Sequence, residues 1–477
     1  MEYKPTIGLE MHCESKTDAK MFSSAKNFHT DNPNSNIKAL DMAFPGTLPV
    51  VNKEAIKKAI MMAMCINCEV PDELVFERKN YFYPDLPTGY QLTQQNYKPI
   101  GVNGYLDVEV GEEVKRIYIN NIHQEVDTAS LDHFFDYSLI DYNRCGVPLL
   151  ECVTEPCIHS ADEAVAFLET MRSIYKYTDI SEADTKKGQI RCDVNISVAP
   201  ADSKELGTRV EIKNVNSFGS VRDAINYEVK RHIDLLKAGK GDEIKQETRR
   251  WDDEKSITTV MRSKEDAIDY KYFLEPNIPK IKLAKEWLDE IRNSIPMLPL
   301  ERKELYIEKY ALSAYDAGVI VKEKEIADYF EKCLELKIDP KAASNWITSM
   351  IMGYLNKNDQ TINEFYLTPE RLSVILDAIN NNKISSKQAK ELFYLVLEEQ
   401  DEPATLMKKH GMEQLDNDDE LEAIIKEILA NNASQIEEYK NGKTNMFDYF
   451  VGQTMKATKG KANPVKVKDI LTSELSK

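Results

Sequence analysis

The sequence predicts an α+β protein, in which an N-terminal antiparallel-sheet domain is followed by helices alone. Two observations support this fold class. Segments in which apolar and polar residues alternate, which is typical of half-buried strands, lie before residue 293. After a proline-containing break at 293–300, apolar residues recur at helical spacing. We therefore expect a sheet domain with helices at 1–293, an all-α domain at 294–407 and a small helical tail domain at 408–477.

The composition is that of a globular protein. Of the 477 residues, 42% are hydrophobic and 30% are charged. No apolar run reaches the ~18 residues of a membrane span, and the N-terminus has no signal or transit pattern, so we expect a cytoplasmic protein. The net charge of −18 argues against a non-specific nucleic-acid coat. Residues 450–477, however, carry six lysines against two carboxylates and form a basic tail.

Several common signatures are absent from the sequence. The eight cysteines are scattered, and for the single CxxC pair, Cys65-Ile-Asn-Cys68, we expect core packing and not zinc or redox chemistry. The chain has no GxxxxGK[ST] loop, no strand–GxGxxG–helix motif and no GxSxG motif. Any use of ATP therefore requires another scaffold.

The first predicted strand covers residues 6–14. Its polar parity would present two carboxylates and an imidazole within about 13 Å, at roughly 3.3 Å per residue. Such oxygen and nitrogen ligands suit a hard or borderline divalent cation, and a solvated sheet face is the alternative. These polar residues are Glu10, His12 and Glu14.

A loop at 21–50 and a helix at about 55–64, capped by Asn52, come next. Residues 76–87 are rich in aromatic side chains and include the adjacent cations Arg78 and Lys79. This stretch either stacks a base and holds a phosphate, or forms a core strand and turn.

The remaining elements follow from turn, cap and periodicity signals. Residues 98–127 are expected to be β, with turns at Asn103-Gly104 and Gly111-Glu112. The capping-box sequence Ser160-Ala-Asp-Glu163 predicts the start of a helix. Two strands with alternating polarity are expected at 189–197 and 208–213. A helix at 221–238 is expected to end at Gly239. Further helices are predicted at 307–310, 322–336, 342–355, 369–380, 386–399 and 418–430.

Four predicted strands carry polar faces of similar chemistry. Acids and histidines gathered with arginine and lysine are typical of a surface that binds a metal ion and phosphate, since carboxylates hold the cation and basic side chains neutralise phosphoryl oxygens. An ordinary solvent face remains the alternative. The four faces are Glu10/His12, His123/Glu125/Asp127, Arg191/Asp193/Asn195 and Arg209/Glu211/Lys213.

Longer motifs extend over nearly the whole chain. They are Ile7-Gly-Leu-Glu-Met-His12, 44–52, Arg78-Lys-Asn-Tyr-Phe-Tyr-Pro-Asp85, Asp141-Tyr-Asn-Arg144, Arg191-Cys-Asp-Val-Asn195, 211–217, 246–249, 261–265, 313–316 and 451–464. In this order they resemble the B-subunit family of bacterial tRNA-dependent amidotransferases, the GatB/GatE family.

The resemblance implies that the sheet domain is the family's cradle domain, which uses ATP and Mg²⁺ to phosphorylate the side-chain carboxylate of a misacylated Glu-tRNA(Gln) or Asp-tRNA(Asn). Ammonia from an amidase-type A subunit then displaces phosphate and forms the amide. A heterotrimer with this amidase and a small C subunit is implied, and the helical region and basic tail are implied to bind tRNA.

The resemblance also suggests roles for individual residues. We expect Glu10, His12 and Glu125 to form a Mg²⁺ centre. Asp193 and Glu211 are expected as further carboxylates at or beside this centre. Lys79 is expected at the transferring phosphate, assisted by Arg191, Arg209 and Lys213. The 3′-terminal aminoacyl-adenosine is expected to be positioned by Tyr81 and Tyr83.

The chain departs from the family pattern in several places. Thr128-Ala-Ser130 replaces a Gly-Lys, and Asp269-Tyr-Lys-Tyr-Phe-Leu-Glu-Pro-Asn277 replaces Asp-Tyr-Arg-Tyr-Phe-Pro-Glu-Pro-Asp. No cysteine lies between residues 20 and 45, where many members have a zinc-type cluster, so we expect no zinc. The family's His-x-Glu-Glu-Asp is here His123-Gln-Glu-Val-Asp127, and His133-Phe-Phe-Asp136 replaces a glycine-rich loop. Two alternatives therefore stay open: a diverged, non-catalytic tRNA-binding or scaffold subunit of the same complex, and an unrelated Mg²⁺-dependent kinase.

Overall fold

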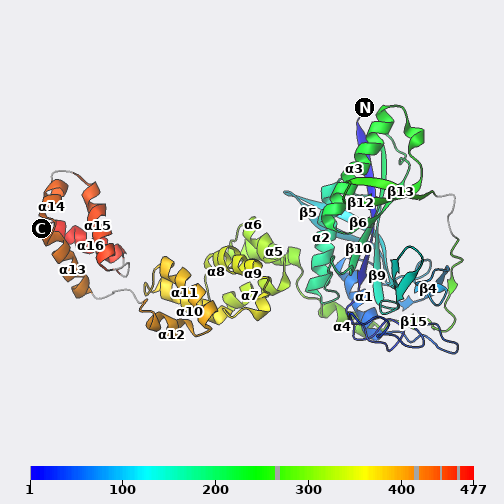
Figure 1. The fold of residues 1–477 in the computed structure, drawn as a ribbon, viewed down its shortest axis with the longest axis horizontal. Helices are drawn as coiled ribbons and strands as arrows, with labels where there is room; N and C mark the ends of the chain where they lie inside the picture. The colour runs from blue at the N-terminus through cyan, green and yellow to red at the C-terminus, as the bar shows by residue number, and fades with distance from the viewer. Residues whose placement is uncertain are drawn as a thin grey trace. The chain divides into compact units, whose positions relative to one another are not determined.

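The computed structural model describes residues 2–263, 269–412, 418–440, 443–458, 462 and 464–476. The end of the 261–265 motif and three lysines of the basic tail, Lys459, Lys461 and Lys477, lie outside this set. The chain divides into two compact units, Met1–Pro299 and Leu300–Lys477 (Figure 1). The first contains the sheet and the second is helical, which confirms the predicted α+β class. Among the described residues, no helix is both long and apolar enough to cross a bilayer.

An eight-stranded sheet forms the centre of the first unit. Across the sheet, the strands are β13 (Ile257–Ser263), β12 (Glu247–Asp252), β11 (Val210–Val215), β10 (Ile190–Pro200), β1 (Tyr3–Glu14), β9 (Pro148–Thr154), β6 (Glu113–Val126) and β5 (Gly101–Val110). Neighbouring strands are antiparallel, as predicted, with one exception: β11 and β12 run parallel.

Helices cover one face of this sheet. The apolar parity of β1 is buried, and it packs with α1 (Lys53–Cys65), α2 (Ala161–Tyr177) and α3 (Phe218–Lys237) in one hydrophobic core. Each such side chain stabilises the fold by about 1.5–3 kcal/mol. Figure 1 shows α2 and α3 on the same side of the strands. The polar parity of β1 therefore faces the opposite side of the sheet.

Helices α1 and α2 begin at the capping residues that the sequence predicts. Asn52 accepts hydrogen bonds from the backbone N–H groups of Glu54 and Ala55. Ser160 accepts one from Glu163, but the Glu163 carboxylate accepts from the backbone N–H of His159 and not from that of Ser160. The capping box is therefore only half formed, because the carboxylate reaches one residue further back.

The predicted turn at Asn103-Gly104 is wrong. Both residues lie inside β5, and the pairing register with β6 continues across them. Asn103 takes a left-handed φ of 54°. The backbone is therefore locally irregular at this residue, although the strand continues through it. Gly104 is required by close approach, since a Cβ there would lie 2.4 Å from Cys68 Sγ. The turn predicted at Gly111, with φ 65°, is confirmed.

Smaller sheets accompany the large one in the first unit. They are β3 (Glu77–Asn80), β4 (Tyr90–Thr93) and β14 (Phe273–Leu274); β2 (Glu73–Leu74) and β15 (Ile281–Lys282); and the hairpin of β7 (Ser130–His133) and β8 (Ser138–Asp141). Residues 76–87 contain the predicted core strand, because buried Phe76 leads into β3; an aromatic loop follows, with Phe82 94% exposed, and base stacking by this loop stays a prediction. Helix α4 (Lys285–Asn293) ends the unit.

The second unit contains two hydrophobic cores, one formed by residues 306–412 and one by residues 421–475. Helices occur wherever helical spacing predicts them, and a π-helical turn, Ile347–Ile351, interrupts the segment predicted at 342–355. The helices are α5 (Pro299–Tyr310), α6 (Ala314–Ile320), α7 (Lys324–Glu335), α8 (Pro340–Trp346), α9 (Met352–Asn358), α10 (Pro369–Asn380), α11 (Ser386–Glu399), α12 (Pro403–Lys409), α13 (Asp418–Ala430), α14 (Ala433–Lys440), α15 (Asn445–Ala457) and α16 (Pro464–Leu475).

A buried ion cluster attaches α3 to β12 and β13. The carboxylate of Glu228 lies 2.8 Å from Arg231 Nη2, 3.1 Å from Arg249 Nε and 3.3 Å from His232 Nε2, and Thr258 donates a hydrogen bond to it. Burial opposes ionisation, but the bonds from His232, Arg231 and Thr258 lower the pKa of Glu228 from 4.5 to about 2.

We predict that Glu228→Gln destabilises the first unit most at neutral pH. A carboxylate with a depressed folded-state pKa contributes its stability above pH 4.5, here about 3 kcal/mol, and loses it as the pH falls toward 2. The difference in thermal midpoint between the variant and the wild type should therefore shrink below pH 4.5, as followed by far-ultraviolet circular dichroism. Glu205→Gln, at an exposed carboxylate, is the control. A difference that does not vary with pH would contradict this account.

Candidate functional site

The candidate site lies on the polar face of the large sheet, where β1, β9 and β6 are neighbours. The antiparallel registers place His12 of β1 and His123 of β6 on either side of Glu151 of β9. His12 Nε2 is 3.2 Å from Glu151 Oε2, and His123 Nε2 is 3.3 Å from the same oxygen. One buried carboxylate therefore joins two imidazoles across three strands.

Glu125 extends this row along β6. Its Oε1 lies 3.4 Å from His123 Nε2. Two side chains of β4 hold the carboxylate from the other side: Gln91 Nε2 donates to one oxygen at 3.0 Å, and Thr93 Oγ1 donates to the other at 2.8 Å. Hydrogen bonds of this kind fix the orientation of carboxylates that bind metal ions.

Glu10 closes the site on the side of β10. Its Oε1 lies 3.8 Å from His12 Nε2, and Glu10 is paired in register with Asp193. Burial, followed by the charges of Glu151 and Asp193, raises the pKa of Glu10 to about 7. Burial opposes protonation of His123, but Glu151 and Glu125 raise its pKa to about 10. The site is therefore rich in negative charge, which a divalent cation would offset.

The residues present fit such a cation. Two sets of three ligand atoms each lie within 4.8 Å of one another: Glu10, His12 and Glu151 form one set, and His123, Glu125 and Glu151 form the other. Within the described part of the chain, buried His123 Nε2 has no hydrogen-bond partner, whereas Nδ1 is held 2.8 Å from Asn121 Oδ1. A histidine ligand is usually held through one ring nitrogen and binds the metal through the other, so a cation between Glu125 and Glu151 would take the place of the proton on His123 Nε2.

Lys79 of β3 lies next to this cluster. Burial opposes its charge, but Glu125 and Glu151 raise its pKa above the ordinary range. Its Nζ also lies 5.2 Å from the centre of the Tyr270 ring. Lys79 therefore stays protonated at the edge of the carboxylate cluster, where it can hold a phosphoryl oxygen.

The two predicted aromatic residues lie in different surroundings. The Tyr81 ring is 5.9 Å from that of Tyr270, edge to face, and burial raises the pKa of Tyr81. Tyr81 therefore contacts Tyr270, whose ring also lies next to Lys79. Tyr83, in contrast, is 54% exposed to solvent.

Asp193 and Glu211 share one lysine, which compensates part of their charge within the chain. Lys213 Nζ forms an ion pair with Asp193 and lies 3.2 Å from Glu211 Oε1. Thr248 Oγ1 donates a hydrogen bond to Glu211 Oε2 at 2.7 Å. Burial opposes the charge of Lys213, but Asp193 raises its pKa above the ordinary range. These groups border Glu10, and neither carboxylate belongs to the two ligand sets.

The predicted arginines do not join the cluster directly. Arg191 forms an ion pair with Asp127, whose Oδ1 also lies 3.6 Å from Arg144 Nε. Burial, followed by Asp127, raises the pKa of neighbouring Glu14 to about 7. Arg209 is exposed one residue before β11, and among the described residues no ion pair or hydrogen bond joins its side chain to the site.

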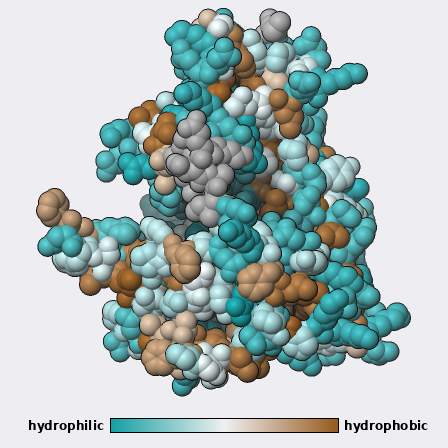
Figure 2. All heavy atoms as spheres, turned by 90° about the vertical axis from the view of Figure 1, so that its right-hand side faces the viewer, coloured by the Kyte–Doolittle hydropathy of each residue, from teal (hydrophilic) through white to brown (hydrophobic). Residues whose placement is uncertain are grey.

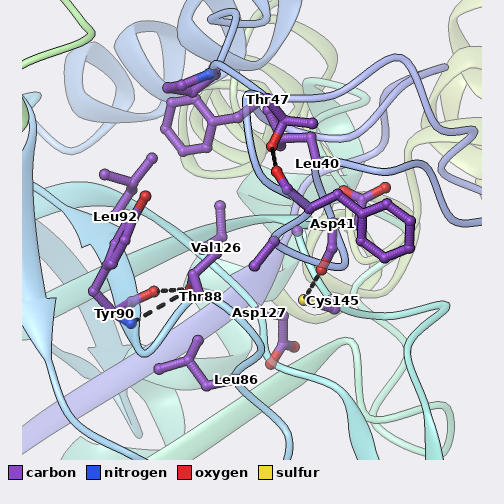
Figure 3. Close-up of a pocket in the computed structure, with 15 residues that line it drawn as sticks. Leu40, Asp41, Thr47, Leu86, Thr88, Tyr90, Leu92, Val126, Asp127 and Cys145 are labelled. Carbon is purple, nitrogen blue, oxygen red and sulfur yellow. Dashed lines mark hydrogen bonds between the residues drawn. The ribbon is translucent and has the colours of Figure 1, made fainter.

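A cavity of about 250 Å³ lies at the end of β6 (Figure 3). Val126 and Asp127 line one side, and Leu40, Asp41 and Thr47 of the loop before α1 line another. Figure 3 shows these side chains converging on one space. Asp41 fixes the loop, since it accepts hydrogen bonds from Ser23 Oγ and from the backbone N–H of Lys38, both at 2.8 Å, and lies 3.8 Å from fully buried Lys20.

Two residues of the site, Glu151 and His123, were not predicted from the sequence as metal ligands. Glu151 lies in the apolar run Pro-Leu-Leu-Glu-Cys-Val-Thr of β9. A single acid in such a run is a signal that could have identified it, since buried carboxylates are rare unless they are paired. His123 shares its strand parity with Glu125, but only the register with β9 shows that both histidines face one carboxylate.

Comparisons with known proteins cover the whole chain. Residues 5–289 match the family model of the GatB/GatE catalytic domain, and residues 328–475 match that of the GatB domain. The chain is 45% identical to the B subunit of the aspartyl/glutamyl-tRNA(Asn/Gln) amidotransferase of Caldicellulosiruptor bescii and 44% identical to that of Halalkalibacterium halodurans, with 100% of each chain covered. The corresponding protein of Carboxydothermus hydrogenoformans is 42% identical, with 100% of this chain and 99% of the relative covered.

We predict that Glu151→Gln weakens the binding of Mg²⁺ about 100-fold, because Glu151 belongs to both ligand sets. Isothermal titration of the metal-free protein with MgCl₂ measures this affinity. Glu109→Gln, on an exposed position of β5, is the matched control and should bind as the wild type does. Equal affinities of Glu151→Gln and the control would exclude the cluster as a Mg²⁺ site.

Proposed function

The chain belongs to the GatB/GatE family, and we propose that it is the B subunit of an aspartyl/glutamyl-tRNA(Asn/Gln) amidotransferase, a heteromeric carbon–nitrogen ligase. The proposed reaction converts misacylated Glu-tRNA(Gln), Asp-tRNA(Asn) or both into Gln-tRNA(Gln) and Asn-tRNA(Asn). The observation that carries the proposal is the row of His12, Glu151 and His123, with Glu10, Glu125 and Lys79 beside it.

The chemistry requires activation of a carboxylate. A carboxylate is a poor acyl donor, so we propose that the side-chain carboxylate of the aminoacyl group attacks the γ-phosphorus of ATP, which forms an acyl phosphate and ADP. Ammonia then attacks the acyl carbon, phosphate leaves, and the nitrogen loses a proton to give the amide. When bound, ATP supplies the phosphoryl group and Mg²⁺ neutralises its oxygens.

The residues of the chain have distinct tasks in this proposal. Mg²⁺ would be held by Glu10, His12, Glu125 and Glu151, with His123 as a further ligand. Lys79 would bind the transferring phosphoryl group, because it stays charged beside Glu125. Lys213, Asp193 and Glu211 would set the charge next to Glu10, and Arg191 and Arg209 would attract phosphate from further away.

The tRNA end and the ammonia reach this site from separate sources. We propose that Tyr81 and Tyr83 position the 3′-terminal aminoacyl-adenosine, and that the helical unit and basic tail bind the rest of the tRNA. An amidase-type A subunit would release ammonia from glutamine, and a small C subunit would complete the heterotrimer. We propose that this assembly is cytoplasmic and that this chain binds no zinc. Ammonia must stay unprotonated to react, and we propose that the partly apolar cavity lined by Val126 holds it before the reaction.

A non-catalytic role is the second candidate, motivated by Val126 in place of a family acid. Val126 is 9% exposed and lines the cavity, and its backbone C=O accepts a hydrogen bond from Gln91. Even without an acid at position 126, the two ligand sets contain three carboxylates. This supports the catalytic role.

We predict that Glu10→Ala and Glu125→Ala each reduce product formation at least about 100-fold, because each removes a carboxylate from the cation site. The assay combines this chain, the amidase-type partner, misacylated tRNA, ATP and glutamine, and each misacylated tRNA is tested separately. Glu109→Gln is the control. If both alanine variants form product at the wild-type rate, the cluster is not catalytic. ATP hydrolysis without stimulation by tRNA would favour the unrelated kinase.

We predict that deletion of residues 410–477 weakens tRNA binding and that the loss shrinks at high salt. Residues 450–477 of the deleted segment form its basic part, and contacts between their lysines and phosphate release counterions. Filter binding at low and high salt measures the effect. An unchanged affinity at low salt would remove the tail from the tRNA interface.

A further inference from the structure

The β7–β8 hairpin carries an exposed aromatic tip that the proposed catalytic steps do not use. Phe135 is fully exposed, and Phe134 and Tyr137 are about half exposed. The backbone N–H of Phe134 donates to Tyr137 C=O at 2.9 Å, and His133 Nδ1 lies 2.8 Å from Ser138 Oγ. The tip is thus an ordered turn that presents its rings to solvent.

Two of these rings already stack on each other. The centroids of Phe134 and Tyr137 are 4.7 Å apart, with 16° between their planes. Parallel rings at this distance leave their outer faces free, and a planar group can continue the stack on either side. Nucleic-acid bases supply such planar groups, and stacking on an aromatic side chain tolerates any base.

The base of the hairpin is joined to the aromatic loop that follows β3. The backbone N–H of Ala129 donates to Asp85 C=O at 3.0 Å, and Tyr142 Oη donates to Pro84 C=O at 3.1 Å. The same loop carries exposed Phe82 and Tyr83. Figure 2 shows hydrophobic side chains standing out from a mostly hydrophilic face of the first unit.

A polar cleft of about 470 Å³ begins at the base of the hairpin, where Ser130 and Asp141 line it. Lys16, Arg144 and Lys187 line it as well and can meet phosphate groups, and Asp141 and Glu14 can accept hydrogen bonds from ribose hydroxyls. Glu14 follows Glu10 and His12 on the same parity of β1. The cleft therefore reaches the strand face that carries the cation site.

We propose that the aromatic tip of the β7–β8 hairpin stacks the unpaired 3′ nucleotides of the tRNA and guides the aminoacyl end through the cleft to the cation site. This inference rests on the proposed function and adds positioning residues to it, namely Phe134, Phe135 and Tyr137. A protein partner is the less suitable occupant, because a four-residue tip is small beside the roughly 800 Å² that each partner buries in a stable interface. Asp136 in the tip and Asp132 in the adjoining strand β7 also favour contacts with bases over contacts with phosphates.

The test compares two tRNAs with the full-length chain: an intact fluorescent tRNA, and the same tRNA trimmed of its unpaired 3′ nucleotides. Anisotropy at fixed low salt gives both dissociation constants. Phe135→Ala/Tyr137→Ala should lose about 10-fold or more in affinity for the intact tRNA and nothing for the trimmed one. Tyr118→Ala, at a similarly exposed ring on β6, is the matched control and should change neither.

A second pair of variants tests stacking itself. Phe135→Trp should keep the wild-type affinity for intact tRNA, and Phe135→Leu, which stays apolar but has no ring, should lose it. Equal loss for both tRNAs, full affinity of Phe135→Leu or no loss in the double variant would each overturn the inference. Thermal midpoints equal to that of the wild type show that the variants remain folded.

The two proposals fail separately. A wild-type chain without amidotransferase activity that still discriminates the two tRNAs through Phe135 and Tyr137 refutes the proposed reaction and supports the hairpin contact. A fully active enzyme whose hairpin variants bind both tRNAs as the wild type does refutes the hairpin contact alone.

Discussion

A carboxylate buried between two imidazoles determines how the functional face of the sheet is built. Removing an isolated carboxylate from water costs several kcal/mol, so Glu151 requires His12 and His123 on its two sides. Both contacts exist only if β9 lies between β1 and β6 in one fixed register. The strand order of the sheet therefore brings together residues that are more than a hundred positions apart in the sequence.

The same face divides into two electrostatic regions. On the side of β11, Lys213 compensates Asp193 and Glu211 from within the chain. On the side of β6, the charges of Glu125 and Glu151 are balanced by His123, whose pKa these carboxylates raise, and by Lys79. A bound cation could replace the proton of His123, and a phosphate could bind Lys79. Residue type alone does not distinguish these regions, because both contain acids next to basic residues.

Much of this architecture could be predicted from the sequence, and the exceptions have physical causes. Alternation identified β1 and β10, and helical spacing identified the helices beyond residue 300, because both patterns are local. The Asn103-Gly104 pair was misleading, since tertiary pairing with β6 overrides its preference for a turn. The position of Glu151 depends on pairing between distant strands, which no local pattern contains.

The register of β9 also limits how this segment of the chain can change in length. Side chains alternate between the two faces, so inserting or deleting one residue within β9 would turn Glu151 into the helix-covered core and bring Leu150 or Cys152 into the row of histidines. A substitution at Glu151 alters one ligand, whereas a one-residue shift exchanges the two faces of the whole strand. Length variation in this region is therefore compatible with the site only in the loops before and after β9.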